Sequence, residues 1–322
     1  MQLAQMSRWY VVSRAIHTVA KLGIADHMST TPTSVDDIAV KTSTNASALN
    51  RLLRFLSAYD LFKQHESGFS LTELSLPLKK DSPNSIKDVL LMADDSWWEA
   101  FAHLDNSIKT GGAAFTHQHG DDFFSYLSKH PEKQNNFDRG MAKLSTYDDD
   151  NIAKSYPFET FKSIIDLGAG RGGLVKAINK RYPNIPITLF DTDAVISQLN
   201  AADYARVITL ETGSFFAEIP ARDAYLFKGV LHDFNDEDMR KILSNTRNQI
   251  PKSSKLLIIE QVMPDDDKPH PNKTMDIVMM VLLAGRQRTL QEWQDIVNPI
   301  GFRFLKSHPT ESIFSIMVFE PS

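Results

Sequence analysis

The chain has 322 residues and a net charge of −5 at pH 7, with 42% hydrophobic and 23% charged residues. This composition is typical of a globular protein, long enough for two domains of ~100–200 residues each. The negative charge gives no general attraction to nucleic acid or to an anionic membrane, so we expect neither partner. The sequence has no cysteine, which excludes disulfides, thiolate metal sites and a cysteine nucleophile, and predicts a cytoplasmic protein. The longest apolar run, residues 277–284, is too short to span a bilayer.

The first part of the chain, to about residue 147, has the spacing of helices. Segments 34–41 and 45–56 predict two capped helices, and segments 61–64 and 68–71 predict a small paired wing. This pattern is typical of a winged helix, which raises DNA binding as one interpretation. Residues 1–80 carry nine basic and six acidic residues, a net of only +3, so the charge needed to bind phosphates is nearly absent.

From residue 158 onward, apolar strand candidates alternate with helical stretches, which predicts a parallel α/β sheet. The last two strand candidates, 302–307 and 312–319, are too close for a helical crossover and predict an antiparallel hairpin at the sheet edge. The five earlier strand candidates are 162–167, 185–191, 206–211, 224–228 and 255–260.

A glycine-rich turn follows the first of these strands, in Asp166-Leu-Gly-Ala-Gly-Arg-Gly. Glycines at 168, 170 and 172 let the backbone turn sharply and approach a nucleotide cofactor, with a helix following. Gly168, Gly170 and Gly173 also match the dinucleotide pattern G-x-G-x-x-G, which is weak evidence by itself. NAD and another nucleoside cofactor therefore both remain open at this point.

Polar residues stand at the carboxyl ends of four predicted strands, where open α/β sheets bind ligands. Asp166 and Asp191 close the first two strands. Asp191 lies about twenty residues past the glycines, where a carboxylate can accept hydrogen bonds from both ribose hydroxyls. His232 follows the fourth strand and Glu260 ends the fifth, an arrangement suited to an oriented general base. We interpret Asp233, next to this histidine, as a helix cap.

Two further segments have competing interpretations. The segment 117–122, His-Gln-His-Gly-Asp-Asp, offers ligands for zinc or iron, but we favour a polar loop with an N-cap and expect no metal. For the methionine-rich segment 275–283 we favour buried core, and the alternative is a flexible wall of a pocket for flat aromatic ligands.

Taken together, the motifs resemble the plant-type O-methyltransferase family over nearly the whole chain. The matching segments are 15–26, 166–172, 189–191, 213–216, 225–234, Glu260 and 284–289. The resemblance implies a class I methyltransferase with a Rossmann-like α/β sheet and an antiparallel C-terminal hairpin, preceded by a mostly α, winged-helix-like dimerisation domain. It implies S-adenosylmethionine instead of NAD, and a homodimer. The expected domains are 1–85 for dimerisation, 86–150 as a helical linker contributing to the substrate pocket, and 151–322 for catalysis.

The resemblance also implies roles for individual residues. His232 becomes the catalytic base and Glu260 the acid that orients it. Two residues depart from the family pattern: Ser214 stands where an acid is common before Phe215, and Gln287 replaces a second acid flanking the histidine. The remaining implied roles are cofactor binding by Asp166, Gly168, Gly170, Asp191, Ser214, Phe215 and Lys228, and substrate contact by Met141, Asp276, Met279 and Gln287.

The leading hypothesis is methyl transfer from S-adenosylmethionine to a hydroxyl of an aromatic small molecule. A relative that methylates nitrogen or carbon, or has diverged to another reaction, is the alternative on the same fold. A ligand-sensing winged-helix regulator is the non-enzymatic alternative, and an NAD-dependent dehydrogenase is a more distant one.

Overall fold

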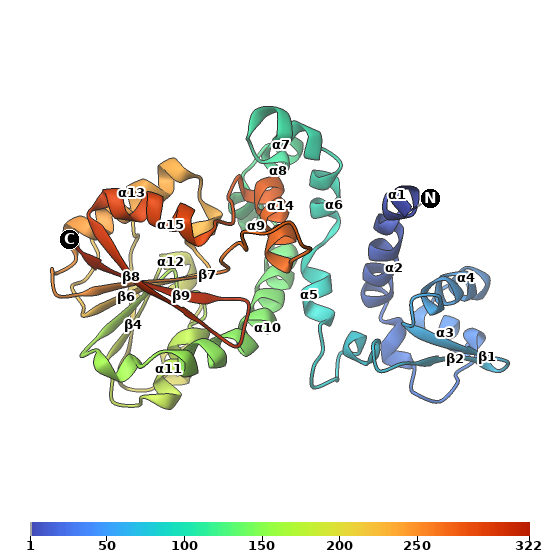
Figure 1. Cartoon of the computed structure of the whole chain (residues 1–322). Helices are drawn as coiled ribbons and strands as arrows, with labels where there is room; N and C mark the ends of the chain where they lie inside the picture. The colour runs from blue at the N-terminus through green and yellow to red at the C-terminus, as the bar shows by residue number, and fades with distance from the viewer. Residues whose placement is uncertain (1) are drawn as a thin grey trace. The chain divides into compact units, whose positions relative to one another are not determined.

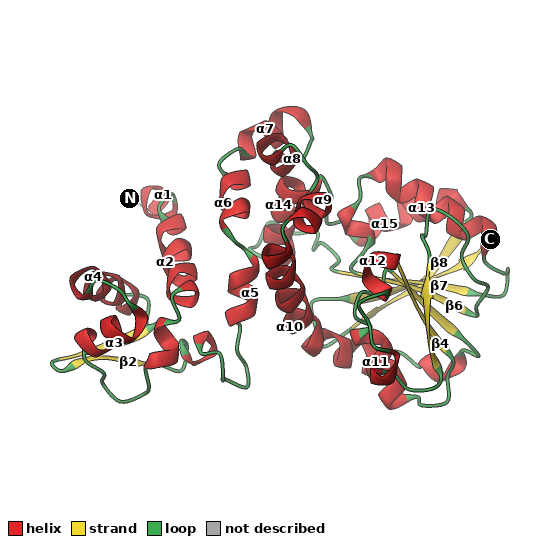
Figure 2. Ribbon diagram, turned by 180° about the vertical axis from the view of Figure 1, so that it is seen from behind, coloured by secondary structure: helices red, strands yellow, loops and turns green. Residues whose placement is uncertain are grey.

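The structure is a computed structural model that describes residues 2–322 (Figures 1 and 2). The chain forms two compact units, residues 2–94 with 130–143, and residues 95–129 with 144–322. Helix α10 (Pro131–Ser155) contributes residues to both units. These units are defined by their compactness and not by function. The expected division into domains at residues 85 and 150 therefore stays a prediction.

The first unit is helical with a two-stranded wing. Ser34 and Asn45 each accept a hydrogen bond from a backbone amide three residues later, so both predicted N-caps are confirmed. The wing pairs Phe62 with Leu71 in antiparallel register, also as expected. Its elements are α1 (Gln2–Met6), α2 (Trp9–Lys21), η1 (Ile24–His27), α3 (Val35–Thr42), α4 (Ala46–Ser57), β1 (Phe62–His65), β2 (Gly68–Leu71), η2 (Leu76–Leu78) and α5 (Lys87–Met92).

The second unit contains a seven-stranded sheet with the order β5-β4-β3-β6-β7-β9-β8. The first five strands are parallel and the last two antiparallel, which confirms the predicted sheet and its terminal hairpin. The strands are β3 (Ile164–Leu167), β4 (Ile187–Asp191), β5 (Ile208–Thr212), β6 (Ala224–Lys228), β7 (Lys255–Glu260), β8 (Phe302–Pro309) and β9 (Ser315–Pro321).

Helices cover both faces of this sheet (Figure 2). Alternate strand residues point to opposite faces, so Ile165 packs in the core layer under α13 and α15, whereas Ile164 packs in the layer under α11. The elements of this unit, besides the end of α10, are α6 (Asp95–Phe101), α7 (Leu104–Thr110), α8 (Ala114–His119), α9 (Phe123–Lys129), η3 (Phe158–Thr160), α11 (Gly173–Arg181), α12 (Asp193–Ile196), η4 (Ala201–Asp203), η5 (Leu231–Asp233), α13 (Asp236–Gln249), α14 (Pro271–Leu283), α15 (Leu290–Val297) and η6 (Asn298–Ile300).

The longest apolar run of the sequence lies mostly in α14. Met279, Val281 and Leu282 of this helix are buried, in agreement with the core interpretation of the segment. Within residues 2–322, no helix combines the length and the apolar character that crossing a bilayer demands.

The turn of the wing depends on Gly68, whose φ of 136° is a backbone conformation that side chains rarely permit. A Cβ at this position would also overlap the carbonyl oxygen of Thr33. We expect Gly68→Ala to lower the free energy of unfolding by about 2–3 kcal/mol, measured by urea titration. Gly112→Ala is the control, since its Cβ meets only the Thr110 hydroxyl at 3.4 Å. Equal stability of the two variants would contradict the argument.

Candidate active site

The glycine turn leads from β3 into α11 at the carboxyl edge of the sheet. Gly168 and Gly170 both have positive φ, 77° and 55°. A Cβ on Gly170 would meet no atom within 4 Å, so the backbone here borders open space. A Cβ on Gly168 would lie 3.6 Å from the Phe215 ring and 2.9 Å from Val230. The turn is therefore open on one side and closely packed on the other.

Asp191 ends β4 and holds this turn in place. Its Oδ2 accepts a hydrogen bond from the Gly170 amide at 2.8 Å, and its Oδ1 accepts one from the Thr192 amide at 2.7 Å. Each carboxylate oxygen keeps a further lone pair for a hydroxyl donor. The structure thus brings Asp191 and the glycines together, as the sequence predicted.

Asp166 is buried at the end of β3, with 3% of its surface exposed. Burial raises the pKa of its carboxyl to about 7, Lys228 opposes this shift, and the charges of Asp149 and Asp191 add to it. Lys228 lies 2.9 Å from Asp149 Oδ1 and donates to Ser145 Oγ at 3.2 Å. A lysine is therefore surrounded by carboxylates at this edge of the sheet.

Asp149 and Ser145 come from α10, and reasoning from the sequence missed both. The only signal was the run of three acids at 148–150, which reads equally well as a solvated helix face. Asp149 is instead 4% exposed, and burial raises the pKa of its carboxyl.

Phe215 follows β5 and packs edge-on against the rings of Phe227 and Phe234. Ser214 accepts a hydrogen bond from the amide of Phe216 at 3.2 Å, so its hydroxyl takes part in the local turn. The neighbouring Phe216 ring is 49% exposed. The segment offers an aromatic surface beside the glycine turn.

His232 lies in η5, just past the end of β6, and its ring nitrogens face two carboxylates. Nδ1 is 2.7 Å from Glu260 Oε2, and Nε2 is 3.2 Å from Asp233 Oδ1. Burial lowers the pKa of this imidazole, but the charges of Glu260 and Asp233 outweigh it and set the pKa well above 6.5. The predicted pair of His232 and Glu260 is therefore present in the structure.

Glu260 is fully buried and forms hydrogen bonds with backbone amides as well as with the His232 ring. Its Oε1 accepts hydrogen bonds from the amides of Val230, Leu231 and His232, at 3.2, 3.0 and 3.3 Å. A buried carboxylate requires several donors, and here four of them surround it.

The interpretation of Asp233 as a helix cap is wrong. Asn235 caps α13 instead, since its side chain accepts from the amide of Asp238. The two residues between Asp233 and the helix leave its carboxylate free to turn back toward the imidazole.

The segment after α14 lies against the histidine. The amide of Arg286 donates to the His232 carbonyl oxygen at 3.0 Å, and the amide of Gln287 donates to Asp276 Oδ1 at 2.7 Å. Gln287 is 2% exposed, and its side-chain amide has no hydrogen-bond partner among residues 2–322. Met279 is buried one turn along α14 from Asp276.

Met141 belongs to the part of α10 that groups with the first compact unit, and its side chain is 40% exposed. Its role near the acceptor stays a prediction.

The segment 117–122 does not form a loop throughout, because both histidines lie in the last turn of α8. His119 bonds the carbonyl oxygen of Ser96 at 3.1 Å, and Asp122 accepts from the amide of Ser125. The expected polar cap at Asp122 is thus correct. Among the described residues, no group of three or more acidic or histidine side chains could hold a metal ion.

The chain matches known protein families over most of its length. Residues 101–303 match the O-methyltransferase domain, and residues 2–80 match the O-methyltransferase dimerisation domain. The chain belongs to the O-methyltransferase family. It is an S-adenosylmethionine-dependent O-methyltransferase, which confirms the resemblance and the cofactor expected from the sequence.

Similar proteins include the phenazine O-methyltransferase PhzM of Lysobacter antibioticus, 34% identical over 99% of this chain and 95% of the relative. The solved structure of the mitomycin 7-O-methyltransferase MmcR aligns with a TM-score of 0.91 and 27% identity, covering 100% of this chain and 97% of that one. The O-methyltransferase NcsB1 from neocarzinostatin biosynthesis, solved with S-adenosylmethionine and 2-hydroxy-5-methyl naphthoic acid, aligns with a TM-score of 0.85 and 26% identity, covering 97% and 96%. These relatives favour the methyltransferase over the regulator and the dehydrogenase, and oxygen over nitrogen or carbon.

Proposed function

We propose that the acceptor of this O-methyltransferase is a hydroxyl on an aromatic small molecule and that His232 is the general base. The observation that carries the proposal is the 2.7 Å contact between His232 Nδ1 and the buried carboxylate of Glu260. The contact fixes one nitrogen of the imidazole and leaves Nε2 as the atom that can receive a proton. The named acceptors of similar proteins, a phenazine and a naphthoic acid, support an aromatic substrate.

The chemistry of the base also favours a phenol. A phenol has a pKa of about 10, which lies within reach of an imidazole whose pKa is raised. An aliphatic alcohol is far less acidic and would demand a much stronger base. Gln287 carries no charge, so the neighbouring carboxylates of Glu260 and Asp233 supply the field that stabilises the imidazolium.

The residues at the carboxyl edge fit S-adenosylmethionine. The open space at Gly170 leaves room for a ligand against the backbone, and the Asp191 carboxylate can accept hydrogen bonds from the ribose hydroxyls. Phe215 offers a flat face for adenine, with the Ser214 hydroxyl beside it, and we assign the neighbouring Lys228 and Asp166 to the cofactor's polar end. When bound, the cofactor supplies a methyl group that its sulfonium already makes electrophilic.

The remaining task of the chain is to position the acceptor and to exclude water. Alignment of two reactants contributes a large part of the rate in such a transfer. We assign this task to Met279, Asp276 and Gln287, which lie on or next to α14.

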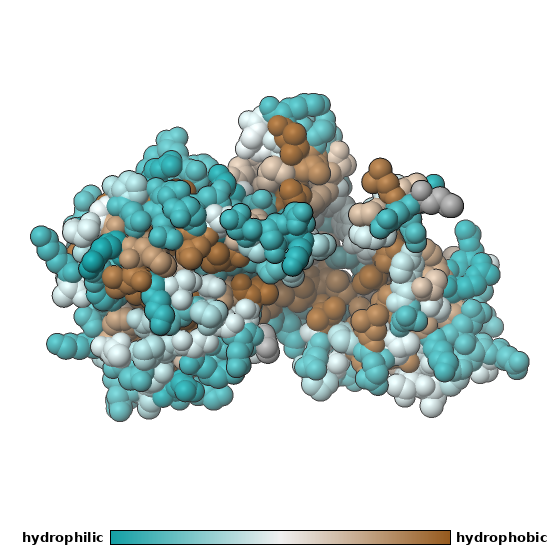
Figure 3. All heavy atoms as spheres, in the orientation of Figure 1, coloured by the Kyte–Doolittle hydropathy of each residue, from teal (hydrophilic) through white to brown (hydrophobic). Residues whose placement is uncertain are grey.

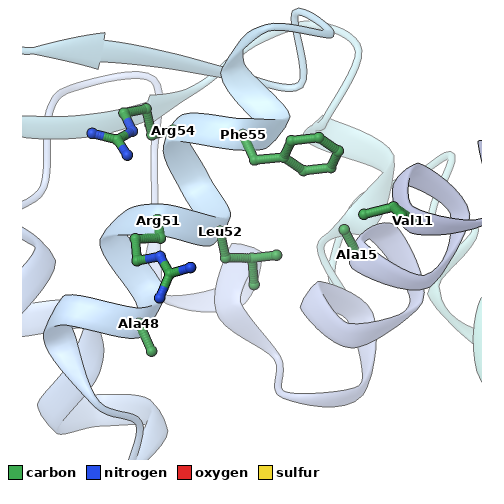
Figure 4. A pocket seen from close by; sticks show the side chains of 7 residues that line it. All are labelled: Val11, Ala15, Ala48, Arg51, Leu52, Arg54 and Phe55. Carbon is green, nitrogen blue, oxygen red and sulfur yellow. The ribbon is translucent and has the colours of Figure 1, made fainter. Parts of the chain in front are cut away.

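We further propose a homodimer that forms through the first unit. Exposed apolar and aromatic side chains gather on α1 and α2, where Leu3 is 79%, Trp9 56% and Tyr10 66% exposed. Figure 3 shows hydrophobic residues, in brown, at the surface of this part of the chain. A groove lies between α2 and α4, with Leu52 and Phe55 turned toward Val11 (Figure 4). Its lining is mainly apolar and also includes Arg51 and Arg54. A second copy covering this surface would bury it.

A cytoplasmic location, with neither nucleic acid nor a membrane as partner, also stays a proposal. The cysteine-free sequence and the net charge of −5 support it.

Replacing Asp191 tests the cofactor site. Asp191→Ala removes a charge-assisted hydrogen bond of ~1.5–3 kcal/mol to ribose, together with the bond that holds the Gly170 amide. We expect calorimetry to show S-adenosylmethionine binding weakened by about tenfold or more. The control, Asp193→Ala, removes an exposed acid two residues away. Unchanged affinity in a folded Asp191→Ala variant would refute the ribose contact.

Light scattering at micromolar concentration tests the dimer. We expect the mass of two chains for the wild type, and of one chain for Trp9→Glu, since a charge on this apolar surface opposes its burial. Ile313→Glu, which changes an exposed apolar residue of the other unit, should remain a dimer. A monomeric wild type would contradict the proposal.

Replacing His232 tests the base. His232→Ala should bind S-adenosylmethionine normally and lower methyl transfer at neutral pH by ~10²–10⁴-fold. The neutral imidazole is the active form and its pKa is raised, so the wild-type rate should fall as pH decreases from a point above 6.5.

The acceptor separates a base from a residue that only shapes the pocket. A phenol already ionised at the assay pH needs no proton removed, so the deficit of His232→Ala should shrink for acidic phenols and at high pH. His27→Ala, which removes an exposed histidine of the first unit, is the control and should behave as wild type. Wild-type rates for His232→Ala at every pH would exclude the base.

A further inference from the structure

The His232 ring is held between two carboxylates that differ in their access to solvent. The Glu260 side chain, at Nδ1, is 0% exposed, whereas the Asp233 side chain, at Nε2, is 22% exposed. Glu260 is also fixed by the backbone amides of residues 230–232. The Nε2 side is therefore the side of the ring that is more open to solvent, and a carboxylate already stands there.

Asp233 has no structural task that explains its orientation. Asn235 caps α13, and within residues 2–322 the Asp233 carboxylate makes an ion-pair contact with the His232 ring and no other hydrogen bond or ion pair. Gln287, at the position where a second acid was expected, is uncharged and its side-chain amide bonds no described residue. The second negative charge on this imidazole thus comes from the next residue in the chain.

We propose that Asp233 is a positioning residue of the reaction, whose carboxylate orients His232 through Nε2 until the acceptor hydroxyl takes its place there. This inference rests on His232 acting as the base. Asp233 can accept from Nε2 only while the ring is an imidazolium, so the Nε2 proton first passes to solvent and leaves the neutral, active ring. In the step that follows, the acceptor O–H bond breaks, a new N–H bond forms at Nε2, and the oxygen forms its bond to the methyl carbon as the S–C bond of the cofactor breaks. The displaced carboxylate stays beside the imidazolium and stabilises it, and the proton then passes to solvent.

Other charged groups near the ring are already paired. Arg288 is fully buried and donates to Asp236, and Arg286 pairs with Glu292. On α14, which packs against η5, Asp276 accepts from the Gln287 amide. Beyond η5, Lys228 pairs with Asp149. Glu260 and Asp233 are accordingly the charges that raise the pKa of His232.

The Asp233 carboxylate affects the pKa of His232 in a defined direction. A carboxylate favours the imidazolium, so removing the charge of Asp233 lowers the pKa of His232 and leaves more neutral imidazole at low pH. An opposite charge at this separation shifts a pKa by about one unit or more. Loss of Asp233 should therefore extend activity toward lower pH while weakening the alignment of the ring.

The test compares wild type, Asp233→Asn and Asp233→Glu by kcat/KM against pH and by NMR titration of the His232 imidazole. We expect Asp233→Asn to move both the acid limb of the profile and the titration midpoint down by about one pH unit. Asp233→Glu, which keeps the charge, should restore much of the wild-type midpoint. Glu237→Gln is the matched control, because it removes an exposed acid four residues away and should move neither.

The outcomes separate this inference from the function on which it rests. An acid limb that survives in His232→Ala would overturn the base itself. A limb that disappears in His232→Ala yet stays in place in a folded Asp233→Asn variant would overturn only the role of Asp233. A shift in Glu237→Gln as large as that in Asp233→Asn would also overturn it, because the effect would then be one of net charge.

Discussion

The buried carboxylate of Glu260 is the group on which the turn after β6 and the position of the His232 ring depend. One oxygen binds three consecutive backbone amides and the other meets the His232 ring. A charge with no solvent exposure is stable only when donors surround it. The turn after β6 and the orientation of the imidazole therefore both depend on this side chain. A change in either would leave buried polar groups without hydrogen-bond partners.

The sheet supplies the second constraint. Parallel strands end at one edge, so the polar residues that close β3, β4, β6 and β7 come together although they are far apart in the sequence. Asp191 binds the glycine turn across this edge, and Lys228 lies near Asp166. The site is thus a property of strand order, with loops and α10 adding groups around it.

Much of the fold and of the candidate site could be predicted from the sequence. The periodicity of apolar residues, the polar residues at strand ends and the spacing of the glycines are local signals. The strands at 224–228 and 255–260 were predicted with the observed bounds, whereas β3, β4 and β5 begin two residues later than predicted. Contacts that depend on side-chain direction could not be predicted. Nothing local distinguishes Asp233 turned toward His232 from Asp233 turned toward a helix, and the burial of Asp149 depends on where α10 meets the sheet. The sequence predicts a loop at 117–119, where the structure has the end of α8, because no spacing signal marks so short a helix.

The position of β9 has a consequence for how the protein matures. Glu260 pairs with Ser315 across the junction of β7 and β9, so β7 is an inner strand only when β9 lies beside it. On the ribosome, residue 260 emerges before residues 315–321 have been made, and β7 is then an edge strand beside which water can reach the carboxylate. The surroundings of Glu260 are thus completed late in synthesis, and a nascent chain stalled before β9 would already contain the glycine turn without a shielded Glu260.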